Sequence, residues 1–334
     1  MKKLNLLFIF VLAISLLSSC YPDDNEYPEG ETFGIRDDVD FEDYAKVATN
    51  QSPYNTADYP DFSAVVMFSY SLDGSDSDEY VATGVLVKPD WILTAGHNFF
   101  VAEEQDSPAP ASGIFVLTGN DPNNPTATYE VEKLVFFPSW IEQNEDFIKA
   151  NDLCLVKLSS PITSITPMEI NFETTETIGT TVWYCGFGDY SQQEGHDPDL
   201  FSEKHAIQNI LDRKVDGITS SSGGTTYYGG LLAFDFDSPD GDRNSLGDDI
   251  VNDDEAMLGS GTSSASATAF EGATVQGDSG GPLFIKMGDT WKVCGVLSGG
   301  ASEPIDDHYD SSYGDISVFI RTSPHADWIQ SVIE

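Results

Sequence analysis

Short apolar runs separated by turn residues make up most of the chain from residue 64 onward. Residues 64–70 (AVVMFSY) form one such run, and residues 82–97 read as two strands about a turn at 88–90. Further runs of this kind lie at 129–137, 152–158, 181–187, 204–210, 282–297 and 315–322. Many short strands without a long helical period predict an all-β fold, either an antiparallel sandwich or a barrel.

The last residues follow a helical pattern instead. Ser323 can cap a helix, and Pro324 suits the first helical position. Ala326, Ile329 and Ile333 then fall on one face of the helix. We therefore expect a short C-terminal α-helix that docks on the strands.

Residues 213–272 are rich in Gly, Ser, Thr and Asp and contain few apolar runs. This composition predicts a long acidic insertion or loop. Asp235, Asp237 and Asp240 are candidate calcium ligands within it, because calcium is bound by carboxylate oxygens. Their spacing does not follow the EF-hand loop, so a solvated acidic loop is the favoured interpretation.

The first residues have the pattern of a secretory leader. Lys2 and Lys3 precede an apolar stretch at 4–17 that is short for a membrane span. Leu-Ser-Ser-Cys then resembles the bacterial lipobox, which implies cleavage before Cys20 and lipidation of its sulfur. An ordinary signal peptide with a chance cysteine is the alternative. We expect a signal peptide at 1–19, an acidic tether and lead-in at 20–58, and one folded domain at 59–334.

The chain is strongly acidic, with 15 Lys and Arg against 56 Asp and Glu and a formal charge of −41 at pH 7. Such a charge disfavours nucleic acid as a partner, because its phosphates would be repelled. Solubility in an extracellular setting is the simplest interpretation. Apart from Cys20, the cysteines are Cys154, Cys185 and Cys294. These three cannot all pair, and each lies in an apolar run, so we expect buried free thiols.

Three segments carry candidate chemistry. His97 ends the segment LTAGH, Asp152 begins DLCLVKL, and Ser279 is at the centre of GDSGGP. In this order the motifs resemble those of the trypsin/chymotrypsin (S1) family of serine proteases, over roughly residues 55–334. The resemblance implies the chymotrypsin-like fold of two antiparallel six-stranded β-barrels, with these three residues as the catalytic triad. The other histidines lack such motifs and are expected in exposed loops; they are His196, His205, His308 and His325.

The expected chemistry explains these residue types. A serine hydroxyl is a weak nucleophile that needs a base within reach, and the base needs an orienting partner. The resemblance implies that His97 takes the Ser279 proton and that Asp152 holds the imidazole. The N–H groups of Gly277 and Ser279 would form the oxyanion hole. Glycine at 277 permits the backbone conformation that aims its N–H inward.

The specificity pocket departs from the family pattern. The residue six positions before the catalytic serine lies at the base of the S1 pocket in the family, and here it is Ala273 rather than Asp. An uncharged base disfavours Lys or Arg, whose charge would be desolvated without a partner. Ser298, Gly299 and Gly300 resemble the Ser-Trp-Gly segment that lines the pocket, with Gly299 in place of a Trp wall. Ser317 is a further pocket position by the same resemblance.

Two more departures concern what holds the site together. Asn98 and Val275 stand where the family commonly has cysteines, so the fold must rely on its core. The family often pairs a freed amino terminus with the Asp before the catalytic serine, here Asp278, yet no Ile-Val-Gly-Gly start is found upstream. Either Arg36 is an internal cation for Asp278, or cleavage within 30–50 supplies a new amino terminus.

Together these features predict a secreted, lipid-anchored serine endopeptidase that forms an acyl-enzyme on Ser279 and prefers apolar side chains at S1. The alternatives are a catalytically silent homologue that serves as a surface binding protein, and an esterase-like hydrolase with the same triad. No cofactor is expected to be required, with structural calcium as the alternative. We expect protein or peptide substrates, a monomer, and a location in the bacterial cell envelope, anchored in the outer membrane through Cys20.

Overall fold

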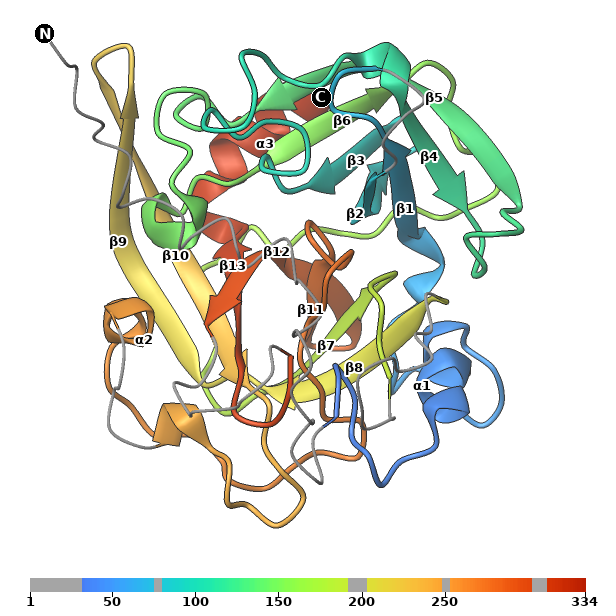
Figure 1. The fold of residues 1–334 in the computed structure, drawn as a ribbon, viewed down its shortest axis with the longest axis vertical. Helices are drawn as coiled ribbons and strands as arrows, with labels where there is room; N and C mark the ends of the chain where they lie inside the picture. The colour runs from blue at the N-terminus through green and yellow to red at the C-terminus, as the bar shows by residue number, and fades with distance from the viewer. Residues whose placement is uncertain (1–31, 75–79, 192–202, 248–252, 302–310) are drawn as a thin grey trace, which may run out of the picture.

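The computed structural model describes residues 32–74, 80–191, 203–247, 253–301 and 311–334 (Figure 1). The predicted leader, the lipidation site Cys20, and the histidines at 196 and 308 lie outside these ranges. No helix within them is long and apolar enough to cross a membrane.

The first half of the chain folds into a closed antiparallel barrel with the strand order β1-β2-β3-β6-β5-β4 (Figure 1). The strands are β1 (Val65–Tyr70), β2 (Tyr80–Lys88), β3 (Trp91–Thr94), β4 (Ile114–Thr118), β5 (Ala127–Phe136) and β6 (Cys154–Leu158). Strands β3 and β6 are buried along almost their whole length, as their continuous apolar runs require. This barrel and the short helices confirm the predicted all-β class.

The second half forms a seven-stranded antiparallel sheet with the order β8-β7-β11-β12-β13-β10-β9. Its strands are β7 (Thr181–Gly186), β8 (His205–Ile210), β9 (Arg213–Ser222), β10 (Thr225–Asp235), β11 (Pro282–Met287), β12 (Thr290–Ala301) and β13 (Ile316–Arg321). A second six-stranded barrel was expected here. The sheet has one strand more because the β9–β10 hairpin pairs beyond β13, and the arrangement remains consistent with the predicted chymotrypsin-like fold.

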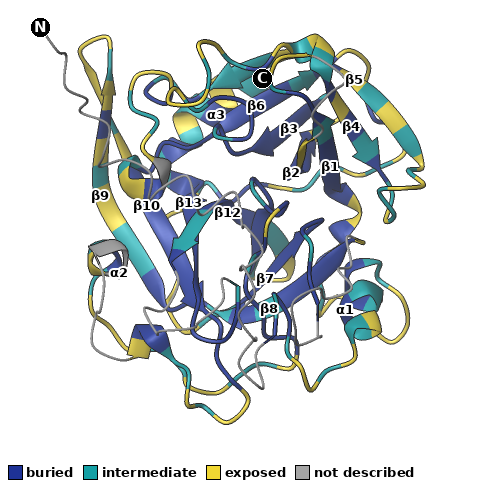
Figure 2. Cartoon of the chain, viewed as in Figure 1, coloured by how far each residue is buried: buried dark blue, intermediate teal, exposed yellow. Residues whose placement is uncertain are grey.

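This hairpin occupies residues that the composition assigned to a loop. The base of β10 is buried, whereas the tip of the hairpin is largely exposed, so its polar residues hide the strand signal (Figure 2). The hairpin packs on the segment that leads into Asp152. The ring of Tyr227 meets Phe137 edge-on at 5.2 Å, and the Oγ atoms of Ser220 and Ser139 are 2.7 Å apart. The hairpin thus links the second sheet to the first barrel. The rest of the predicted insertion is mostly irregular and holds α2 (Asp253–Leu258).

The chain from residue 32 to 58, expected as tether and lead-in, is folded onto the second sheet. Helix α1 (Phe41–Ala48) packs against β8, with Tyr44 and Val47 fully buried. Asp40 caps this helix by accepting a hydrogen bond from the Glu42 N–H. Ile35 is also fully buried. Apolar residues at these positions therefore extend the folded body toward the N-terminus.

The C-terminal helix α3 (Ala326–Ile333) is present, but it begins differently from the prediction. A 3-10 turn (Ser323–His325) precedes it, and the Ser323 hydroxyl donates to Glu176 Oε1 at 3.1 Å rather than capping the helix. Ile329 is fully buried against the core. The start of α3 is therefore fastened to the segment that joins the two halves of the molecule.

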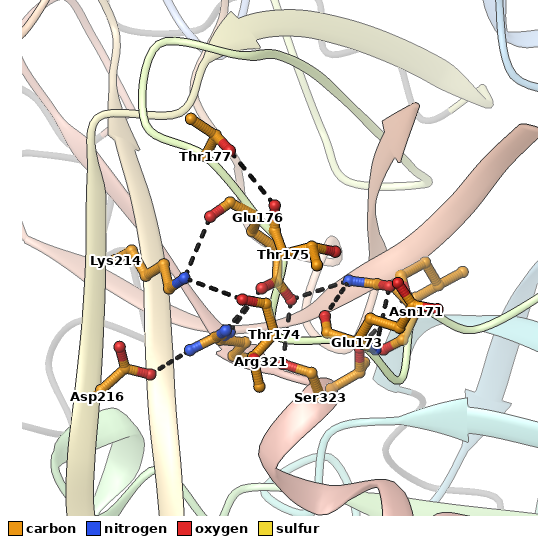
Figure 3. Close-up of polar contacts among 12 residues, drawn as sticks. Asn171, Glu173, Thr174, Thr175, Glu176, Thr177, Lys214, Asp216, Arg321 and Ser323 are labelled. Atoms are coloured by element: carbon orange, nitrogen blue, oxygen red, sulfur yellow. Dashed lines mark hydrogen bonds and ion pairs between the residues drawn. The ribbon is translucent and has the colours of Figure 1, made fainter. Parts of the chain in front are cut away.

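A buried ionic network makes this attachment (Figure 3). Arg321 donates through Nε and Nη2 to Glu176 Oε2, at 3.0 and 2.6 Å, and neither side chain is exposed. The other carboxylate oxygen accepts from Asn171 Nδ2 at 3.0 Å and from Ser323. The remaining Arg321 nitrogen donates to Asp216 on β9. Buried charges are tolerated when they are paired and hydrogen-bonded in this way.

Candidate active site

The three candidate catalytic residues come from both halves of the molecule. His97 follows β3, and Asp152 comes shortly before β6. Strands β3 and β6 are hydrogen-bonded neighbours, with Thr94 opposite Cys154, so the barrel itself brings the two residues together. Ser279 lies in the loop before β11 of the second sheet. That loop contacts the barrel through the Thr83 N–H, which donates to the Ser279 carbonyl at 2.9 Å.

Asp152 holds His97 at two points. The His97 Nδ1 lies 2.6 Å from Asp152 Oδ2, and the His97 backbone N–H donates to Oδ1 at 2.8 Å. Ser298 also donates its hydroxyl to Oδ2, at 2.6 Å. Because the fully buried carboxylate accepts the proton on Nδ1, it fixes the tautomer in which Nε2 is the basic nitrogen.

The loop that carries Asp152 is fixed by its neighbour. Asn151 is fully buried, and its Nδ2 donates to Ser139 Oγ at 3.0 Å and to the Gln143 carbonyl at 2.9 Å. Ala150 just before it adopts a left-handed conformation, with φ of 48°. The Asn-Asp pair therefore acts as a unit in which Asn151 positions the backbone and Asp152 positions the histidine.

Three residues that the sequence analysis did not assign to the active site hold the backbone of Ser279. Asn98 Nδ2 donates to the Ser279 carbonyl at 3.1 Å and to Thr94 Oγ1 at 3.0 Å. Thr94 in turn donates to the Thr83 carbonyl at 2.7 Å. Asn98 thus bridges the histidine and serine loops from a position where the family often has cysteine. A Cβ on Gly280 would overlap Thr94 Oγ1, so glycine is needed there.

The oxyanion-hole candidates have the required backbone. Gly277 has a φ of 95°, which non-glycine residues rarely adopt. Its carbonyl accepts from Thr83 Oγ1 at 3.0 Å, which fixes the peptide. Within the described part of the chain, the N–H groups of Gly277 and Ser279 donate to no protein acceptor. Both are therefore available to an oxygen of a ligand.

The residue predicted to form the base of the S1 pocket has apolar surroundings. Ala273 is buried in a small cluster with Phe236 and Tyr313. Ser317 lies nearby, and its Oγ accepts from the Thr274 N–H at 3.1 Å and lies 3.0 Å from Thr274 Oγ1. The polar atoms of this wall are thus engaged with one another, which suits an uncharged occupant.

An aromatic ring lies beside Gly299, although this position lacks the Trp of the family pattern. A Cβ built on Gly299 would lie 3.3 Å from Cδ1 of Phe147, which is almost fully buried. Phe147 comes from the 3-10 turn before Asp152 (Asp146–Lys149). Gly300 pairs with Ser317 across β12 and β13, so the predicted pocket residues do lie on adjacent strands.

Asp278 is fully buried, and its carboxylate is held by backbone donors. Gly188 N–H donates to Oδ1 at 2.8 Å, and Val275 N–H donates to Oδ2 at 3.0 Å. A Cβ on Gly188 would lie 2.7 Å from Asp278 Cγ, so the CGFG segment is shaped around this carboxylate. The predicted cation Arg36 is wrong, because Arg36 makes its ion pair with Asp38 instead, at 2.7 Å.

Two histidines expected in exposed loops are buried. His205 on β8 is fully buried, and His325 at the start of α3 is 2 % exposed. The ring of His325 packs against Phe137, with centroids 4.6 Å apart. Burial lowers the pKa of His325 to about 4, so this ring is neutral at pH 7.

The candidate calcium ligands do not converge. Asp235 and Asp237 are buried, whereas Asp240 is exposed and accepts from Ser238 Oγ at 2.7 Å. In the described ranges, no group of three or more His, Cys, Asp or Glu side chains is placed to hold a metal ion. Burial raises the pKa of Asp237 to about 9 and that of Glu271 to about 8, so both carboxyls retain protons near neutral pH.

Comparison with protein families agrees with this geometry. The family model described as Trypsin matches residues 55–230. The match covers just over half of the chain, including His97, Asp152 and the whole six-stranded barrel. The chain therefore belongs to the trypsin family of serine proteases.

Proposed function

We propose that this protein is a serine endopeptidase that cleaves peptide bonds through an acyl-enzyme on Ser279. The observation that carries the proposal is the pair of hydrogen bonds that His97 donates to Asp152, in a trypsin-family chain whose Ser279 loop is fastened to the same barrel. The Thr83 N–H and the Asn98 side-chain amide both donate to the Ser279 carbonyl, and these contacts support a preassembled nucleophile loop.

The proposed reaction follows from these placements. His97 Nε2 accepts the Ser279 Oγ proton as Oγ bonds to the substrate carbonyl carbon, and the imidazolium is stabilised by Asp152. The N–H groups of Gly277 and Ser279 would hold the negative oxygen that develops. Collapse breaks the C–N bond, and His97 gives its proton to the leaving amine. A water molecule then repeats the sequence on the ester, which releases the acid and restores Ser279.

We further propose that the S1 pocket takes apolar side chains. Ala273, Phe236 and Tyr313 give its base no charge, and the hydroxyl of Ser317 is engaged with Thr274. A substrate with Arg at P1 would bury its charge without a partner. Peptides that differ only at P1 should therefore show higher kcat/KM with Leu, Phe or Ala than with Arg, and preferential cleavage after Arg would contradict this assignment.

The direct test is labelling of the purified mature chain with a fluorophosphonate probe. Wild type should label, Ser279→Ala should not, and the surface variant Ser331→Ala should label like wild type. No labelling of wild type would support a silent binding protein instead. Hydrolysis of activated esters with no cleavage of any peptide in a diverse library would favour the esterase alternative.

We also propose that the mature protein is secreted and held at the cell envelope by lipid on Cys20, where it acts as a monomer without a required cofactor. The Leu-Ser-Ser-Cys sequence supports the anchor. Incorporation of labelled palmitate by wild type, with none by Cys20→Ala, is the expected result. Activity should survive EDTA, because the proposed steps use only side chains and backbone N–H groups of the protein.

A further inference from the structure

A second histidine lies against the residue before the candidate nucleophile. His205 begins β8 and pairs with Gly186 of β7, which places its ring beside Asp278. His205 Nε2 is 3.6 Å from Asp278 Oδ2, and both side chains are fully buried. This contact could not be predicted, because neither spacing nor motif links the two residues.

The surroundings of both side chains favour a charged pair. Among the described residues neither ring nitrogen of His205 has a hydrogen-bond partner, and the Asp278 carboxylate is the acid within ion-pair reach of the ring. Asp278 accepts two backbone N–H groups, but in the described structure no Lys or Arg lies within ion-pair distance of it. A buried carboxylate without a cation is strongly unfavourable. One proton on His205 supplies the missing positive charge, with Nε2 lying 3.6 Å from Oδ2.

We propose that protonated His205 is the internal cation of Asp278, and that this pair holds the Gly277–Ser279 loop in its working arrangement without an activating cut. His205 is then a positioning residue that acts through Asp278. Its role in catalysis rests on the proposed peptidase function, because it matters only if the loop supplies the nucleophile and the oxyanion hole.

Other groups around His205 do not take over this role. Besides Asp278, the described titratable and charged residues on β7, beside His205 in the chain or in ring contact with it are Tyr184, Cys185, Tyr190, Glu203 and Lys204. Helix α1, which packs on β8, adds Glu42, Asp43, Tyr44 and Lys46. Burial raises the pKa values of Tyr190 and Cys185, so both remain neutral. Lys204 Nζ donates to the Phe62 carbonyl at 3.3 Å and lies over the Phe187 ring. Lys46 pairs with Asp43 at 2.8 Å.

The uncut chain around residue 34 also packs against residues that surround His205 and Asp278. The Phe33 N–H donates to the Ser191 carbonyl at 3.1 Å, and the Ala273 N–H donates to the Gly34 carbonyl at 3.1 Å. A Cβ on Gly34 would lie 2.5 Å from Val275 and 3.3 Å from Tyr190, whose ring packs on His205. The peptide upstream of Ile35 is thus built into the folded structure. Cutting it would break these contacts rather than complete the site.

The pair gives activity a defined pH dependence. The proposed pair requires the protonated ring of His205. His97 must be neutral to act as the base, so activity rises with pH at the acid end. We therefore expect a bell-shaped profile whose alkaline limb belongs to His205, a residue that never touches the substrate.

Two measurements on the full mature chain test the proposal. The first is histidine NMR of Ser279→Ala, in which the His205 signal is assigned by its loss in His205→Gln. At pH 7 the His205 ring should be protonated, and adding Asp278→Asn should make it neutral. A ring that is neutral at pH 7 with Asp278 present would overturn the pair. This readout needs no catalysis, so it decides the pair even if wild type proves inactive.

The second measurement is the fluorophosphonate labelling rate against pH. His205→Gln should label at least about tenfold more slowly, and His205→Lys should recover labelling with its alkaline limb at higher pH, because lysine keeps its charge longer. The matched control is His325→Gln, a buried histidine away from Asp278, which should keep the wild-type profile. Wild-type labelling by His205→Gln, or a labelled wild-type chain that begins within 30–50, would overturn the positioning role. Wild type that labels at no pH would instead overturn the peptidase function.

Discussion

The Arg321–Glu176 and His205–Asp278 pairs are both buried, but they are built in opposite ways. Arg321 and Glu176 share two short hydrogen bonds, and their other polar atoms are met by Asn171, Ser323 and Asp216 (Figure 3). His205 and Asp278 face each other at 3.6 Å. An arginine keeps its charge at any pH in which the protein is folded, whereas a histidine gains and loses its charge near neutral pH.

The difference separates structural from functional burial of charge. The Arg321 network fastens the segment between β6 and β7 to β13 and α3, where a permanent link is sufficient. The His205 pair supports the loop that carries the candidate nucleophile, and its charge can be removed by pH alone. A close, fully hydrogen-bonded pair thus stabilises the fold. A pair with a longer separation and a histidine can instead control the arrangement of the nucleophile loop.

Breaking the first pair should give the largest change in stability. Arg321→Met leaves Glu176 buried without its cation and should lower the free energy of unfolding by about 3–5 kcal/mol. Urea denaturation at pH 7 measures this directly. Lys292→Met is the matched control, because it removes only the partly exposed pair with Glu169 and should cost less than about 1 kcal/mol. Equal losses for the two variants would contradict the contrast between buried and exposed pairs.

Glu271 is a buried acid with no ion-pair partner in the described structure, and its contribution to stability should depend on pH in a third way. Glu271 is fully buried, Thr268 N–H donates to Oε2, and Oε1 has no hydrogen-bond partner among the described residues. Burial raises its pKa to about 8, so the folded state holds a proton that the unfolded chain releases near pH 4. Its stabilising contribution is therefore complete at low pH and is lost as the pH rises toward 8.

Glu271→Gln should remove this term. Between pH 6 and 8 the wild type should lose roughly 2 kcal/mol more stability than the variant. Thermal or urea unfolding across this pH range measures the difference, with Glu169→Gln as an exposed control that should follow the wild type. Parallel curves for wild type and Glu271→Gln would mean that this carboxyl is already ionised in the folded protein.

Asn98→Ala tests a buried polar contact that carries no charge, and of these variants it should have the smallest effect on stability. It removes the donors to Ser279 and Thr94, which should cost about 1–2 kcal/mol of stability and slow fluorophosphonate labelling. The Thr83 N–H still holds the Ser279 carbonyl, so labelling should be reduced rather than abolished. The exposed variant Asn124→Ala should change neither quantity. Complete loss of labelling in a folded Asn98→Ala would show that Asn98 alone sets the loop.

Much of this architecture is written in local patterns. Strands such as β1, β6 and β13 could be predicted because apolar runs of five or six residues are bounded by turn residues. The β9–β10 hairpin could not, because its exposed tip carries Ser, Thr and Gly and has no apolar alternation. Helix α1 was missed for a related reason, since its buried face is made of only a few residues within an acidic lead-in.

The candidate site divides in the same way. His97, Asp152 and Ser279 were predicted because each sits in a distinctive motif, and the structure brings His97 and Asp152 into contact. The partner of Asp278 could not be found by motif, since charge complementarity gave Arg36 as readily as any other cation. Only the pairing of β7 with β8 places a histidine there. Contacts between single residues far apart in the chain leave no pattern in the local sequence from which they could be predicted.

The three buried free thiols can report when the structure around each of them opens. Cys154 lies in the barrel, whereas Cys185 and Cys294 lie in the second sheet, and all three are fully buried. Burial raises their pKa values, so in the closed protein little reactive thiolate forms. An alkylating reagent can therefore modify each thiol only when its surroundings come apart. Mass spectrometry of the modified peptides would time the opening of the two halves separately, within a single native chain and without any added label.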